Sequence, residues 1–172
     1  FFLLRDRAPS QAREFYEQYK PRRPLTPQGR LTEEHWIKML FHPNEDPVVG
    51  KIFASILGAL RKAKVQPVAR FQFTEKERQD PATSTIALVK QLGQAAGALN
   101  LPTPLIFLRP QQPGGLGHVP SEPIASVAGG GLLQGLTPQE LAFVAAKHMT
   151  YYRSEHYIRT LFPTVQEISA IL

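Results

Sequence analysis

The stretch from Leu136 to Thr160, LTPQELAFVAAKHMTYYRSEHYIRT, holds side chains that can exchange protons or bind a metal. In a continuous helix, His148, Glu155 and His156 fall near one face, with the Tyr151 phenol nearby. Imidazole and carboxylate groups in such an array can serve as general acids and bases or bind a divalent metal. Histidine and glutamate also share a helix face in many proteins without either role. One hypothesis is therefore a hydrolase with a non-standard metal site.

The helix that must position these groups has a well-marked start. Thr137 can cap it, Pro138 suits the first helical position, and Glu140 stands at the third, where its carboxylate can reach back to the Thr137 amide. We expect a helix from this start through the whole stretch.

Residues 136–146 resemble the "LxxELxxVLA" lead-in of the HtpX-like and CAAX-endopeptidase-like zinc peptidases, which are gluzincins. The helix of those enzymes carries His-Glu-x-x-His, because side chains four apart can hold one zinc ion. In this alignment the two zinc ligands fall on Lys147 and Tyr151, and the catalytic glutamate falls on His148. His156 resembles a histidine that often follows the motif. The resemblance implies a vestigial active site of Lys147, His148, Tyr151, Glu155 and His156, with no catalytic residue and no metal.

The resemblance extends over about Asp80–His156 as an order of elements. ALNLPTPLIFLRP resembles the family's "LGLPxPxVYV" step into a first strand, and a Gly/Pro-rich loop, a second strand and the motif helix follow. The family's third ligand is a glutamate from a later helix; Glu167, in a helix that Thr164 can cap, comes too early for that role. We expect a mostly helical α+β fold, with a small sheet from about Val68–Phe73, Leu105–Leu108 and Ile124–Val127.

Length and composition favour a folded chain. With 172 residues and 42% hydrophobic content it can bury a core. We expect a basic helical N-terminal extension over residues 1–66 and a metallopeptidase-like domain over residues 67–172. Because the chain opens on FFLL without a methionine and stops on Ala-Ile-Leu, we expect a fragment of a longer protein, truncated at the C-terminus of this domain.

The chain has no cysteine, which excludes disulfides and cysteine-based zinc or nucleophile sites. This fits a reducing compartment, and we expect a cytoplasmic protein. The opening FFLLRDR is too short for a secretory apolar region of about 7–15 residues or a membrane span of about 20.

The excess positive charge lies at the N-terminal end. Residues 1–70 hold 13 Lys/Arg and 7 Asp/Glu, a difference of +6, whereas residues 71–172 hold 7 of each. Binding of nucleic acid or an anionic surface through residues 1–70 is therefore an alternative function. Nucleic acid is disfavoured because known nucleic-acid motifs and interleaved aromatic residues are absent from the sequence.

Cap and proline signals predict further helices. The expected helices are Ser10–Lys20, Thr32–Phe41, one from Asp46-Pro47 to about Ala63, and one from Asp80-Pro81 to about Leu99; PRRPLTP at residues 21–27 is expected to be a linker. We expect Trp36 and the apolar face of the third helix to be core, although that face with its basic end is also typical of a membrane-surface helix. Residues 109–123 read as a flexible surface loop, and residues 129–131 as a turn or bulge with positive φ.

Two hypotheses concern binding and charge. In the resembling peptidases an edge strand before the motif helix pairs with substrate, so Ile124, Ala125, Ser126 and Val127 could accept a peptide by strand addition, or could pair only within the domain. Lys147 could replace the metal's charge by bonding to Tyr151 or Glu155, or could extend into solvent.

The leading expectation is a non-catalytic metallopeptidase-like module without a cofactor. It would act as a scaffold that binds another protein or neighbouring domains of the same polypeptide.

Overall fold

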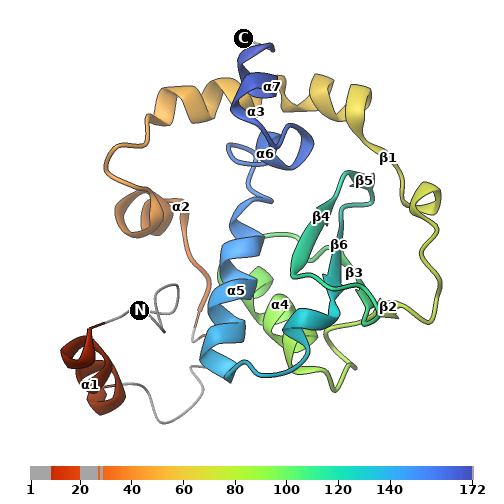
Figure 1. The fold of residues 1–172 in the computed structure, drawn as a ribbon. Helices are drawn as coiled ribbons and strands as arrows, with labels where there is room; N and C mark the ends of the chain where they lie inside the picture. The colour runs from red at the N-terminus through yellow and green to blue at the C-terminus, as the bar shows by residue number, and fades with distance from the viewer. Residues whose placement is uncertain (1–8, 20–26, 28, 172) are drawn as a thin grey trace.

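The computed structural model describes residues 9–19, 27 and 29–171 of the chain, and its elements are shown in Figure 1. About 49% of the structure is helix and 13% is strand, in small sheets. The predicted α+β class, with more helix than strand, is therefore confirmed.

A four-stranded sheet lies beside two helices that pack on each other, α4 (Ala87–Ala98) and α5 (Pro138–Thr150). The two inner strands are parallel to each other, and each outer strand is antiparallel to its neighbour. A separate parallel pair joins β1 to β5. The order in the large sheet is β2 (Arg78–Gln79), β3 (Leu105–Arg109), β6 (Ala125–Gly129) and β4 (Leu116–Val119), and the small pair is β1 (Gln66–Pro67) with β5 (Ser121–Glu122).

The main core lies between the sheet and the two packed helices. Side chains alternate along β3, so Ile106 and Leu108 face this core whereas Phe107 belongs to a smaller cluster. The predicted strand at Leu105–Leu108 is therefore confirmed. The fully or nearly fully buried members of the main core on the helices include Leu88, Val89, Leu92, Ala96, Leu141, Ala145 and Met149.

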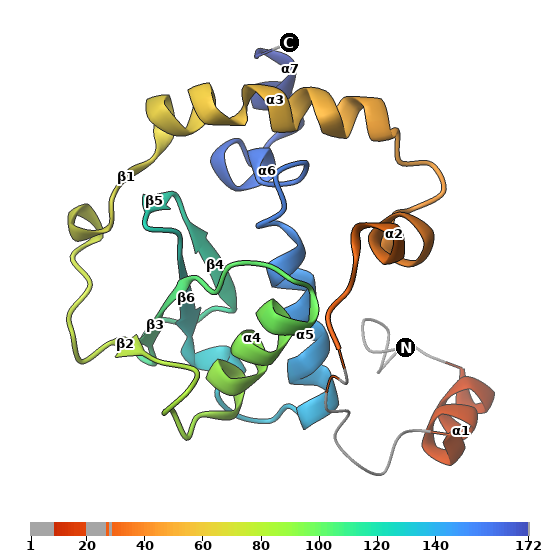
Figure 2. The same cartoon turned by 180° about the vertical axis from the view of Figure 1, so that it is seen from behind.

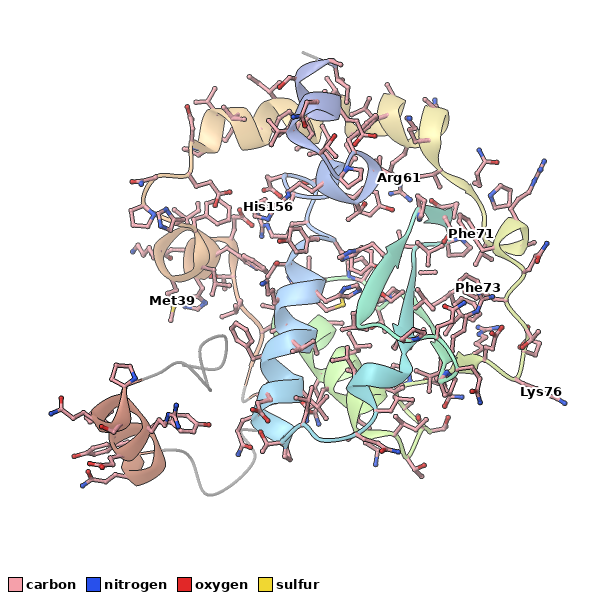
Figure 3. All side chains as sticks on the ribbon, viewed as in Figure 1. Met39, Arg61, Phe71, Phe73, Lys76 and His156 are labelled. Atoms are coloured by element: carbon pink, nitrogen blue, oxygen red, sulfur yellow. The ribbon has the colours of Figure 1, made fainter. Side chains whose placement is uncertain are left out.

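The predicted strand Val68–Phe73 is wrong, because its first four residues form the 3-10 turn η3 (Val68–Phe71). Gln72 then adopts a left-handed conformation with φ 53°. The Arg109 guanidinium donates to the carbonyls of Phe71 and Gln72 at 3.3 and 3.1 Å, so these groups are satisfied without a partner strand. Phe71 and Phe73 still pack beside the sheet, as Figure 3 shows.

The N-terminal helices form where the cap signals predict them. They are α1 (Ser10–Tyr19), α2 (Glu33–His35) with its π-helical continuation η2 (Trp36–Leu40), and α3 (Pro47–Lys64). Trp36 is buried, as predicted, and its indole N–H donates to the Leu99 carbonyl at 3.2 Å. It belongs to the same hydrophobic cluster as α4 and α5. The linker predicted at residues 21–27 lies outside the described residues except for Pro27.

Helix α3 begins as predicted, because the Asp46 carboxylate accepts the Val48 amide and Pro47 follows. It crosses one end of the molecule beside α6 (Ile158–Leu161) and α7 (Val165–Ser169), as Figures 1 and 2 show. The expectation that its whole apolar face is core is wrong. Phe53, Leu57 and Leu60 pack partly against the core, whereas Val48, Val49 and Ile52 are exposed.

Helix α4 starts at Ala87, seven residues after the predicted start at Asp80. The Asp80 carboxylate accepts the Ala82 amide, and the Asp80 carbonyl accepts the Ser84 amide, which closes a separate turn. The predicted end of the helix at about Leu99 is confirmed. The last helical residue is Ala98, Leu99 caps the helix, and Asn100 then adopts a left-handed conformation with φ 55°, which stops it.

Glycines 129–131 are required by close packing and not by positive φ, so that part of the prediction is wrong. A Cβ on Gly129 would lie 2.8 Å from the Gly114 carbonyl oxygen, and one on Gly130 would lie 2.3 Å from the Pro110 carbonyl oxygen. Gly130 opens the 3-10 turn η4 (Gly130–Leu132), which leads from the sheet toward α5.

Gly130→Ala is expected to lower the free energy of unfolding by about 1–3 kcal/mol, because the added methyl group must displace backbone. Urea unfolding followed by Trp36 fluorescence measures the change. Gly58→Ala is the matched control: this α3 glycine has no heavy atom within 4 Å of a built Cβ, so alanine should stabilise by up to about 1 kcal/mol. A loss no larger at Gly130 than at Gly58 would contradict the packing requirement.

Candidate functional site

Helix α5 begins with the predicted capping box. The Thr137 hydroxyl accepts the Glu140 amide at 3.3 Å, and the Glu140 carboxylate accepts the Thr137 amide at 2.8 Å. The expectation of one helix through Thr160 is wrong, because α5 ends at Thr150 and the chain continues in turns to α6. Residues after Thr150 therefore do not share the helical face of His148.

His148 joins a buried chain of hydrogen bonds that connects α5 to β6. Its Nε2 lies 2.9 Å from the Ser126 Oγ, and that oxygen lies 2.7 Å from the Tyr152 hydroxyl. The Tyr152 hydroxyl donates to the Ala125 carbonyl at 2.7 Å. Burial raises the pKa of the Tyr152 phenol above its usual value, although the bond with Ser126 opposes part of that rise.

The proton order in this chain excludes a serine–histidine nucleophile. A carbonyl can only accept, so the single phenol proton of Tyr152 goes to Ala125 and the Ser126 hydroxyl donates to Tyr152. The Ser126 oxygen then accepts Nε2–H of His148, so His148 holds no lone pair toward the serine. Ser126 is 0% exposed and a substrate cannot reach it. The chain of bonds is structural, and it explains why sequence positions 126 and 148 need polar side chains in a core.

His118 of β4 stacks on His148, with ring centroids 3.8 Å apart and planes inclined by 13°. Its Nε2 lies 3.0 Å from the His148 carbonyl, which requires that this nitrogen donate. Burial lowers the pKa of His148 to about 3, and repulsion from His118 acts in the same direction. Burial also lowers the pKa of His118, although its bond to the carbonyl opposes the shift. Both rings are therefore neutral at pH 7.

Lys147 is exposed, and within the described part of the chain its ammonium forms no ion pair or hydrogen bond. The hypothesis that it bonds to Tyr151 or Glu155 in place of a metal is wrong, and the solvent-directed alternative is confirmed. Tyr151 instead contacts His118 edge-on at 5.5 Å, and the Arg159 guanidinium lies 5.3 Å from its ring.

Glu155 and His156 are bound to other groups. Glu155 accepts two hydrogen bonds from Arg153, and the His156 Nε2 lies 2.7 Å from a Glu45 carboxylate oxygen. His156 projects from the segment after α5 on the side where α2 and η2 lie (Figure 3). The predicted grouping of His148, Glu155 and His156 on one helical face is therefore wrong.

These residues do not fit the zinc site of the resembling peptidases. Lys147 and Tyr151 are the residues that the resemblance aligns with the zinc ligands, and the Nε2 of His148 is already bound to Ser126. In the described ranges no group of three or more His, Cys, Asp or Glu is placed to hold a metal ion. The Glu167 carboxylate, in α7, accepts hydrogen bonds from the Thr164 amide and hydroxyl. These bonds form the capping box at the start of that helix.

A cavity of about 370 Å³ lies between β4 and α5. It brings Lys147, His148 and Tyr151 together with His118, which the sequence analysis placed in a flexible loop. That loop prediction is wrong, because residues 109–123 contain β4 and β5. The lining residues are Gly115, Leu116, His118, Leu132, Leu136, Glu140, Phe143, Val144, Lys147, His148 and Tyr151.

The predicted edge strand Ile124–Val127 lies inside the sheet. Its residues 125–127 belong to β6, which pairs with β3 on one side and with β4 on the other, so it cannot accept an added strand. The edge beside the cavity is β4. No sequence signal identified it, because LGHV is four residues long and follows a run rich in Gly and Pro.

The register shows which groups of β4 face outward. Gly115 lies opposite Gly129 and its carbonyl accepts the Gly129 amide at 3.0 Å, so Gly115, Gly117 and Val119 point their backbone groups toward β6. The N–H and C=O groups of Leu116 and His118 then point away from β6. Within the described residues they have no backbone partner.

Comparisons with known proteins gave no matching family model and no significant match to a curated protein or a solved structure. Among the described residues, no helix combines the length and the apolar character that crossing a bilayer requires.

Proposed function

We propose that this chain is a non-catalytic binding module that accepts an extended peptide along the outer edge of β4. The observation that carries the proposal is the outward-facing backbone of Leu116 and His118 directly beside the cavity on α5. An exposed strand edge can pair with a peptide through main-chain hydrogen bonds, while an adjacent cavity receives side chains. The partner would be a segment of another protein or of a neighbouring domain.

The resemblance to zinc metallopeptidases supports the same proposal. Residues 136–146 resemble the lead-in to a peptidase motif helix, and the three positions of the motif hold Lys147, His148 and Tyr151. A protonated lysine cannot ligate zinc, and His148 already serves the structural bond to Ser126. The module would thus keep a peptidase-like arrangement of strand edge and helix for binding without hydrolysis.

A hydrolase built from His148, Glu155 and His156 is a weaker proposal. Glu155 and His156 are held by Arg153 and Glu45, and none of the three shares a helical face with the other two. His148 is 5% exposed and its Nε2 is occupied.

Leu116→Pro tests the proposal, because proline removes the outward N–H of residue 116 and leaves the hydrogen bonds of Gly117 to β6 in place. The matched control is Leu116→Ala, which also removes the leucine side chain but keeps the N–H of residue 116. We expect Leu116→Pro to bind extended peptides at least about tenfold more weakly than Leu116→Ala. The probe is a fluorescein-labelled, threonine-rich nonapeptide with leucine at its centre, and the measurement is fluorescence anisotropy.

Circular dichroism and thermal unfolding of both variants establish that they are folded. Equal affinity of folded Leu116→Pro and Leu116→Ala would eliminate strand addition at this edge. Hydrolysis of the probe by the wild-type chain would show that the non-catalytic part of the proposal is wrong.

A further inference from the structure

Resting on the peptide-binding function proposed above, we propose that the cavity selects an extended peptide with a large apolar side chain and an acidic side chain two residues away, and that Lys147 binds the acidic group. The floor of the cavity would hold the apolar side chain. The carboxylate would lie at the mouth.

The cavity wall is mainly apolar, and its volume of about 370 Å³ exceeds that of one leucine or phenylalanine side chain. Burial of such a side chain supplies roughly 1.5–3 kcal/mol of transfer free energy. The two polar rings in the wall, His118 and His148, are neutral, so they add no net charge that would oppose an apolar group. The apolar wall residues are Leu116, Leu132, Leu136, Phe143 and Val144.

The mouth of the cavity carries positive charge. Lys147 lines the cavity with an exposed side chain and has no acidic partner in the described structure. Arg159 adds a second cation, 5.3 Å from the ring of Tyr151, which also lines the cavity. The acidic lining residue Glu140 accepts hydrogen bonds from the Thr137 amide and hydroxyl, each at 2.8 Å, at the other end of α5. A carboxylate at the Lys147 end would therefore meet uncompensated positive charge.

Strand geometry fixes the spacing of the two side chains. Leu116 and His118 lie two residues apart on β4, and both line the cavity, so they face the same side as α5. A peptide paired with them places every second side chain on that side, about 6.6–6.8 Å apart. One such side chain can enter the apolar part of the cavity while the next one reaches toward Lys147.

The same geometry selects a side-chain carboxylate over a terminal one. Lys147 lies on a helix that packs over the face of the sheet. A terminal carboxylate of a paired peptide lies in the plane of the sheet, whereas a glutamate or aspartate side chain projects from its face toward α5. The ligand is therefore an internal segment of a chain.

The test uses N-acetylated, C-amidated nonapeptides rich in threonine, so that no terminal charge is present. One pair carries leucine and glutamate two residues apart, in both orders, and a second pair carries glutamine in place of glutamate. At low salt the glutamate peptide of the better order should bind the wild-type chain about three- to fivefold more tightly than its glutamine counterpart. Replacing the leucine of the peptide by serine should weaken binding by at least about tenfold.

Lys147→Gln should abolish the preference for glutamate, so that the glutamate and glutamine peptides bind this variant with affinities within about twofold of each other. Lys147→Glu should reverse the preference toward a peptide with lysine in place of glutamate. The matched control is Lys90→Gln, which removes an exposed lysine of α4 that does not line the cavity; it should keep the wild-type preference.

A preference for glutamate that persists in Lys147→Gln, or equal binding of both peptides to the wild-type chain, would overturn the selectivity and leave peptide binding in place. Absence of binding by every peptide would overturn both the selectivity and the proposed function.

Discussion

Lowering the pH from 7 to about 4.5 is expected to reduce the free energy of unfolding by about 3 kcal/mol, because His118 and His148 are packed together without charge. Burial lowers the pKa of His148 to about 3, with a further contribution from His118. Burial also lowers the pKa of His118, which the His148 carbonyl partly opposes. A histidine in the unfolded chain has a pKa of about 6.5.

The direction follows from proton binding. Between about pH 6.5 and pH 3 the unfolded chain takes up protons that folded His148 excludes, so acid favours unfolding. The stabilisation is fully present above about pH 6.5 and is lost as the pH falls toward 3. One fully shifted histidine changes stability by about 1.4 kcal/mol per pH unit in this window. Two units below 6.5 therefore give about 3 kcal/mol from His148 alone.

Urea unfolding at pH 7.0, 6.0, 5.0 and 4.5, followed by Trp36 fluorescence, measures this dependence. His148→Gln keeps an uncharged N–H donor for Ser126 and should flatten the curve between pH 6.5 and 4.5. His42→Gln removes an exposed histidine and should leave the curve as in the wild type. A wild-type stability that stays constant from pH 7 to 4.5 would show that the stacked rings do not exclude protons.

Sequence reasoning succeeded where the stabilising contacts are local. The Asp46 cap with Pro47 and the capping boxes at Thr137 and Thr164 each join residues at most three apart, and each helix start was predicted correctly. The buried strand at Leu105–Leu108 was also predicted, because a short apolar run between prolines and a charged residue indicates a strand. Such contacts are encoded within a few residues and can be identified without the rest of the fold.

The site itself depends on distant contacts, and most of it could not be predicted. His118 faces His148 across 30 positions of sequence, and Ser126 reaches His148 across 22. Strand β4 forms only because β6 pairs with it, so a four-residue segment among glycines and prolines gives no periodic signal. His148, Lys147 and Tyr151 were identified as a group by their positions on one helix, but their partners in β4 were missed.

The boundary of α5 shows how tertiary contacts override helix propensity. Tyr152 is fixed by the Ala125 carbonyl of β6, whereas the neighbouring Arg153 is fixed by Glu33 of α2. A continuing helix would rotate these consecutive side chains by about 100° each around one axis. The chain instead turns after Thr150, which carries Glu155 and His156 away from the cavity and toward the N-terminal helices.

Arg153→Met is expected to lower the free energy of unfolding by about 2–4 kcal/mol, because Arg153 connects the turn after α5 to α2 and η2. Its side chain is 9% exposed and donates to both Glu33 oxygens, at 2.7 and 3.0 Å. It also donates to Glu155 at 2.7 Å, and its guanidinium lies 4.4 Å from the centre of the Trp36 ring. Breaking a fully buried ion pair costs roughly 3–5 kcal/mol. We expect a smaller loss here, because Glu33 is 63% exposed and water screens its charge.

The size of the loss depends on the carboxylate left behind. Burial raises the pKa of Glu155, but the hydrogen bonds and positive charge of Arg153, together with hydrogen bonds from the backbone and from Ser154, lower it overall. In Arg153→Met this half-buried carboxylate therefore loses its counter-ion. Adding Glu155→Gln to Arg153→Met should therefore recover about 1 kcal/mol.

Two further variants are compared with Arg153→Met. Arg153→Lys keeps the positive charge but not the bidentate geometry, and it should lower the free energy of unfolding about half as much as Arg153→Met. Arg70→Met, at an exposed arginine without an ion pair among the described residues, should change stability by less than about 0.5 kcal/mol. Urea unfolding measures all four variants, and a loss at Arg153 no greater than at Arg70 would contradict a stabilising role of Arg153 between the turn after α5 and α2.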